Sequence, residues 1–102
     1  MEYQLVVQVP ARAVEDFDVM IELEEAIIEV LGDAGEVDGH DLGAGEMNIF
    51  ISTDDPRAAF AKLEPMLGKK RLLSSAKAAY RDADGDDFTV LFPEDLEEFT
   101  VA

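Results

Sequence analysis

Hydrophobic residues in this chain switch between two spacings, and the order of these spacings constrains the fold more than any single motif. Residues 3–9 alternate apolar and polar side chains, which is typical of a half-buried strand, and the alternation stops at Pro10. Residues 15–31 instead predict a helix, because their apolar side chains follow the helical repeat: Met20, Leu23, Ile27, Val30 and Leu31. Both spacings within 102 residues indicate one mixed α and β domain.

The middle of the chain predicts two more strands and a second helix. A short strand is expected at 36–40 and another at 47–52, where apolar and polar side chains alternate again. Asp55 before Pro56 is typical of a helix start, because the carboxylate can cap N–H groups and proline needs no donor. Pro65 lies inside the apolar repeat that follows, so we expect this helix to kink or to end near residue 64.

Two further extended segments are expected at 72–81 and 88–92, on either side of an aspartate-rich turn. The resulting order is β-α-β-β-α-β, followed by one additional strand in hairpin with the fourth. This order resembles a ferredoxin-like plait, an α+β two-layer sandwich, over residues 3–92. Residues 94–102 form an acidic tail within the same single domain, 1–102. The plait hosts many unrelated activities, so the resemblance implies a fold and no function.

A plait with both helices on one side of its sheet leaves the other face open. On the central strands that open face is expected to carry Val6 and Phe50 as an apolar spot, beside Gln4, Gln8 and Asn48. We interpret these five residues as a binding surface, through which the chain could also form a homodimer.

The charge of the chain limits its partners. Eight Lys and Arg against 24 Asp and Glu give a net charge of −16, which repels nucleic-acid phosphates and anionic membranes and attracts a protein with a basic surface. There is no cysteine, which excludes disulfides and thiolate chemistry. The acidic start of the chain and the lack of a long apolar run predict a cytoplasmic protein, with no cofactor expected.

Residues 38–48 hold the only histidine, several carboxylates and three glycines. His40 could transfer protons with Asp38 or Asp41 orienting it and with Glu46 nearby, around a divalent cation if one is bound. In a regular strand Asp38 and His40 share a face and Asp41 points away. The alternative is a hairpin loop in which the glycines adopt positive φ: Gly39, Gly43 and Gly45.

The aspartate-rich turn invites a calcium interpretation through Asp82, Asp84 and Asp86, whose oxygens could share one ion. An EF-hand is excluded, because the glycine stands at the fourth place instead of the sixth and Pro93 occupies the twelfth. The alternative is a solvated hairpin turn.

Two functional hypotheses remain. The first is a small acidic, non-catalytic protein-binding domain, in the manner of an inhibitor or immunity protein. The second is a small hydrolase or isomerase that uses the acidic cluster around His40. The chain is strongly acidic and its sequence contains no convincing set of catalytic residues. Together these two observations favour the first hypothesis.

Overall fold

The computed structural model describes residues 2–14, 17–97 and 99. Five strands and two helices make up the fold, joined in part by short 3-10 turns. The strands are β1 (Tyr3–Pro10), β2 (Glu36–Gly43), β3 (Glu46–Thr53), β4 (Lys77–Asp82) and β5 (Thr89–Phe92). The helices are α1 (Phe17–Leu31) and α2 (Pro56–Lys69), and the 3-10 turns are η1 (Ala11–Val14), η2 (Gly32–Ala34) and η3 (Leu73–Ser75).

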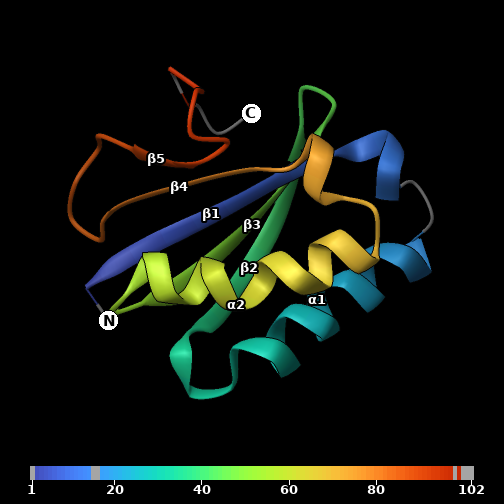
Figure 1. Ribbon diagram of the computed structural model, residues 1–102, viewed down its shortest axis with the longest axis horizontal. Coiled ribbons are helices and arrows are strands. Elements are labelled where there is room, and N and C mark those ends of the chain that lie inside the picture. Colours follow the sequence, from blue (N-terminus) through green and yellow to red (C-terminus); the bar gives the residue numbers. More distant parts are fainter. Residues whose placement is uncertain (1, 15–16, 98, 100–102) are drawn as a thin grey trace.

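The strands form one sheet in the order β2-β3-β1-β4-β5, and every neighbouring pair is antiparallel. Figure 1 shows both helices on the same side of this sheet. The α+β class and the predicted order of elements are therefore confirmed. The strand boundaries differ most from the prediction at the end of β2, which extends three residues beyond position 40, and at the start of β4, which begins at Lys77, after η3. Within the described residues, neither helix has the length and hydrophobicity that crossing a membrane requires.

The start of α2 follows from two residues. Asp55 is its N-cap and accepts a hydrogen bond from the Ala58 amide at 3.1 Å, and Pro56 is the first helical residue, as predicted. Of the two outcomes expected at Pro65, a kink or an end near residue 64, the end is wrong, since α2 continues through Pro65 to Lys69. Proline has no N–H group, so the Ala61 carbonyl lacks the helical hydrogen bond that residue 65 would otherwise donate. Both Ala61 and Pro65 are exposed, so water can replace the missing bond.

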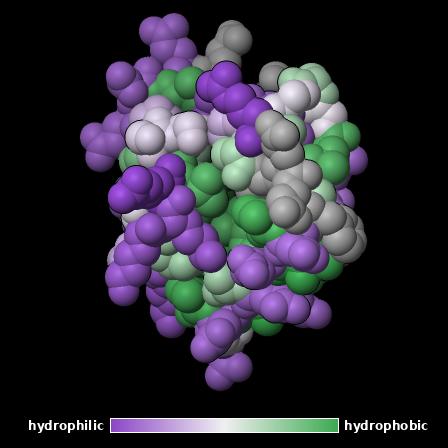
Figure 2. Space-filling model, turned by 90° about the vertical axis from the view of Figure 1, so that its right-hand side faces the viewer, coloured by the Kyte–Doolittle hydropathy of each residue, from purple (hydrophilic) through white to green (hydrophobic). Residues whose placement is uncertain are grey.

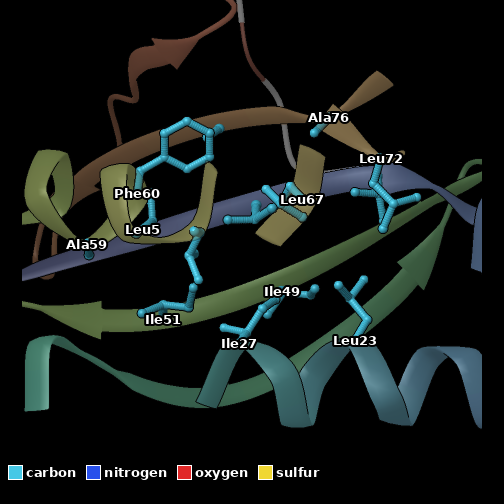
Figure 3. Packing of buried hydrophobic residues seen from close by; sticks show 14 of the residues in the cluster. Leu5, Leu23, Ile27, Ile49, Ile51, Ala59, Phe60, Leu67, Leu72 and Ala76 are labelled. Carbon is cyan, nitrogen blue, oxygen red and sulfur yellow. The ribbon is translucent and has the colours of Figure 1, made fainter. Parts of the chain in front are cut away.

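Alternate residues of the central strands pack against the helices. Figure 3 shows Leu23 and Ile27 of α1 directed towards Ile49 of β3, with Phe60 of α2 above Leu5. These side chains belong to one buried cluster that joins the sheet to both helices. Burial of such side chains is worth roughly 1.5–3 kcal/mol each, so this cluster carries most of the favourable free energy of folding.

Much of the opposite sheet face is covered, which corrects the predicted binding surface in part, since Gln4 and Phe50 are half-buried and the other three residues are buried. Val6 is completely buried, although it pairs with Phe50 on one side and Ala79 on the other as expected for this face. Gln8 and Asn48 are buried as well, and the Gln8 side-chain amide donates to Asn48 Oδ1 at 2.8 Å. The predicted exposure of Val6, Gln8 and Asn48 is therefore wrong, and homodimerisation through Val6 loses its contact surface.

The segment after β4 reaches this second face. Arg81 of β4 donates from Nε to Oε1 of Gln4 at 2.9 Å, and its guanidinium carbon lies 5.7 Å from the ring centroid of Phe88. Phe88 in turn lies 5.2 Å from Phe99, centroid to centroid. Aromatic residues from the last part of the chain thus approach the face that the helices leave uncovered.

Candidate functional site

Three of the four residues of the predicted cluster, including His40, lie on β2, which is an edge strand of the sheet. The pairing of β2 with β3 slips by one residue between Val37 and Gly39, and Gly39 has a φ of 151°, which favours glycine. Asp38 is the extra residue of this β-bulge. A bulge shifts the alternation of side chains along a strand, so Asp38 and His40 no longer share a face.

The contacts of the cluster confirm this separation. His40 pairs in register with Ile49, on the helix side, and its Nδ1 lies 2.6 Å from Oε2 of Glu24 in α1. Asp38 instead accepts a hydrogen bond from the Ser52 hydroxyl. The two side chains that the regular strand would have brought together therefore lie on opposite sides of the sheet.

The remaining two acids of the cluster also lie away from His40. Asp41 pairs in register with Asn48, and Glu46 stands at the start of β3, opposite Gly43. The structure thus brings His40 together with Glu24, a carboxylate from a different element, and not with the acids next to it in sequence. A short span of sequence cannot reveal such a partner, because α1 and β2 meet only in the tertiary fold.

The loop of this hairpin is a two-residue turn. Ala44 and Gly45 both have positive φ, 47° and 80°, which is typical of a type I′ turn between antiparallel strands. Gly39 and Gly45 were expected to take positive φ and do so. The third residue of this hairpin with a positive φ is Ala44, and not Gly43 as expected.

Hydrogen bonds to backbone carbonyls shape the aspartate-rich turn. The Gly85 amide donates to the Asp82 carbonyl at 2.8 Å, and the Arg81 guanidinium donates to the Gly85 carbonyl. Across residues 2–14, 17–97 and 99, no three His, Cys, Asp or Glu side chains are grouped to hold a metal ion. The arrangement therefore gives no support to the metal interpretation of Asp82, Asp84 and Asp86.

A small pocket of about 260 Å³ lies where α1 meets β2, and we call it the α1–β2 pocket. Its walls combine apolar and acidic side chains with the histidine: Met20, Ile21, Glu24, Glu25, Ile28 and His40. Ile21 and Ile28 keep 40% and 52% of their surface exposed. Leu42, two residues after His40 on the edge strand, keeps 49%. Large apolar side chains exposed beside one another are typical of interaction surfaces.

Most of the net negative charge of the chain comes from the segment that forms this pocket. Residues 13–56 contain 14 of the 24 acidic residues and none of the eight Lys and Arg. This span forms α1, β2 and β3, so the two elements that meet at the α1–β2 pocket carry acidic residues and no Lys or Arg. The rest of the chain is close to neutral, with ten acids and eight cations.

Figure 2 shows one side of the molecule, on which hydrophobic residues reach the surface between hydrophilic ones.

A second hollow of about 430 Å³ lies at the start of α2. Two tyrosines and several acids line it, but its polar groups already serve the fold. Asp55 caps α2, Asp54 accepts from the Glu2 amide at 3.1 Å, and the Arg57 guanidinium carbon lies 5.8 Å from the ring centroid of Tyr80. We interpret this hollow as structural.

Among the residues that line the α1–β2 pocket, only His40 was predicted from the sequence to be functional. A signal for them exists in α1, where Ile21 and Ile28 stand seven residues apart among glutamates, outside the apolar repeat that builds the core. Comparison with known proteins found no family model that matches the chain, and no curated protein or solved structure that resembles it significantly. The chemistry of its own surface is therefore what points to a function.

Proposed function

We propose that this chain is a small, acidic, non-catalytic protein-binding domain whose partner carries a basic surface, in the manner of an inhibitor or immunity protein. The observation that carries the proposal is the α1–β2 pocket, where exposed isoleucines lie within a span that has 14 acids and no Lys or Arg. Apolar contact would supply affinity, and the negative field would select and steer a basic partner.

One observation keeps an enzymatic alternative in view. His40 and Glu24 form an imidazole–carboxylate pair beside the α1–β2 pocket, and such a pair can transfer a proton. The other lining residues are apolar apart from Glu25. Among the residues that the structure describes, the pocket walls hold no hydroxyl, Lys or Arg side chain to act as nucleophile or to stabilise an anion. The acid–base pair is thus the one catalytic feature that the described lining offers, so binding ranks first.

The arrangement of the elements supports a finer description of the fold. Without β5, the strand order β2-β3-β1-β4 and the two helices on one side support the proposal of a ferredoxin-like plait. We propose that β5 is an addition to this plait at the edge of β4.

A location in the cytoplasm also remains part of the proposal, and the lack of cysteine agrees with a reducing compartment.

Affinity capture with the full chain tests the proposed function. The purified chain is immobilised and exposed to a lysate of the cells that produce it, and each captured protein is then purified and titrated back. We expect a basic partner with 1:1 stoichiometry whose Kd rises at least about tenfold between 0.1 M and 0.5 M salt, because salt screens exposed charges. A Kd unchanged by salt, or no stoichiometric partner, would contradict the proposal.

A further inference from the structure

The geometry points to one kind of occupant for the α1–β2 pocket, and we propose that it is a basic amphipathic helix of the partner protein. The helix would lie alongside α1, over the edge strand β2. This inference rests on the proposed binding function and deepens it, since it names the secondary structure and the chemistry of the segment that binds.

The spacing of the apolar residues favours a helix. Ile21 and Ile28 are seven residues apart on α1, which is two helical turns or about 10.5 Å at 1.5 Å per residue. Side chains one heptad apart are the contacts that a second helix makes when it packs along the first. Between them lies the pocket of about 260 Å³, which an apolar side chain of the incoming helix can enter. Leu42 of β2 extends the apolar surface beyond His40.

The charges favour a basic segment and disfavour a second copy of this chain. Glu24 and Glu25 line the pocket, and the described part of α1 also carries Asp18, Glu22 and Glu29 without a single cation. A second copy would place the same carboxylates opposite these, and like charges across an interface cost several kcal/mol. Lysines and arginines that flank an apolar stripe would instead pair with both edges of the pocket.

The edge strand itself argues against an occupant that adds a strand to the sheet. β2 has a β-bulge between Val37 and Gly39, and Glu36, Asp38 and Asp41 carry charge along it. Bulges and charged side chains are the features that keep exposed edges from pairing with another chain. We therefore expect the partner to bind on the side of β2 that faces the helices, and not along the backbone edge of this strand.

A binding experiment with defined peptides tests this inference. The probe is a labelled synthetic helix of about 18 residues with leucines along one stripe, lysines beside it and alanine elsewhere. Two comparison peptides have the same composition in scrambled order, or glutamate in place of lysine. Fluorescence anisotropy with the full chain measures Kd, and amide chemical shifts in NMR spectra locate the site.

Surface variants of the full chain supply the matched controls. Ile28→Ser removes apolar surface at the pocket, and Glu25→Gln removes one charge from its wall. Val19→Ser removes a similarly exposed apolar side chain from the same helix, but Val19 does not line the pocket. Circular dichroism confirms that each variant is folded before binding is measured.

We expect the lysine helix to bind and to shift the amides of Ile21, Ile28 and Leu42. Ile28→Ser and Glu25→Gln should each raise Kd at least about fivefold, and Val19→Ser should leave it within about twofold. Equal binding of the scrambled peptide, an equal effect of Val19→Ser, shifts confined to another surface, or no binding would each overturn the inference. If the captured partner shows the expected salt dependence but is insensitive to Ile28→Ser, the proposed function stands and the helix inference fails.

Discussion

His40 of the edge strand and Glu24 of α1 lie 2.6 Å apart, Nδ1 to Oε2, and this contact joins the two elements that form the α1–β2 pocket. Both side chains are partly exposed, so water screens their interaction. Exposed pairs of this kind contribute roughly 0.2–1 kcal/mol. We therefore expect His40→Ala to lower the free energy of unfolding by less than about 1 kcal/mol.

Urea denaturation of wild type, His40→Ala, Glu24→Gln and the double variant forms a cycle that isolates the coupling between the two residues. The expected coupling is at most about 1 kcal/mol at neutral pH. A loss of several kcal/mol on removing His40 would show that the histidine supports the core and is not a surface contact.

The buried hydrogen bond between Gln8 and Asn48 should contribute more to stability than the exposed contacts of the surface. Both side chains are buried on the sheet face away from the helices, and Gln8 Nε2 donates to Asn48 Oδ1 at 2.8 Å. Asn48→Ala takes that acceptor from a buried donor, which costs about 1–3 kcal/mol. Thermal and urea unfolding should show the loss. Ser52→Ala is the control, because its hydroxyl binds an exposed carboxylate and we expect a smaller effect there.

The hairpin turn offers a stabilising substitution. Ala44 has a φ of 47°, a conformation that costs an ordinary L-residue about 1 kcal/mol and that asparagine tolerates better. Ala44→Asn should therefore raise the free energy of unfolding by about 0.5–1 kcal/mol. Gly45→Ala, at a φ of 80°, should lower it. Midpoints of urea unfolding that move the other way would contradict the assigned turn.

Truncation of two apolar residues of α1 should lower stability by very different amounts. Leu23 is 1% exposed and packs in the core, whereas Ile28 is 52% exposed at the α1–β2 pocket. Leu23→Ala should cost about 2–5 kcal/mol of stability, and Ile28→Ala less than about 1 kcal/mol. Only the Ile28 variant should weaken partner binding without unfolding the chain. Comparable stability losses from both would mean that Ile28 is a core residue.

Local signals along the chain predicted much of the fold. The order of strands and helices followed from hydrophobic spacing, and Asp55 with Pro56 marked the start of α2. The end of α2 predicted from Pro65 was wrong, because this proline lies on the exposed side of the helix and lets α2 continue. The glycine at position 39 signalled a positive φ, but the bulge that it permits, and therefore the turn of Asp38 away from His40, depends on how β2 pairs with β3.

The amino-acid sequence by itself determined the alternation of strands and helices, the cap of α2 and the exclusion of cations from residues 13–56, because these depend on neighbouring residues or on composition alone. Only the tertiary structure decided that Val6 is buried, that His40 contacts Glu24 and that Ile21 and Ile28 stay exposed beside a pocket. Each of these depends on segments distant in sequence. Periodicity assigns a side chain to a face of its element, but whether another part of the chain covers that face is settled only by packing.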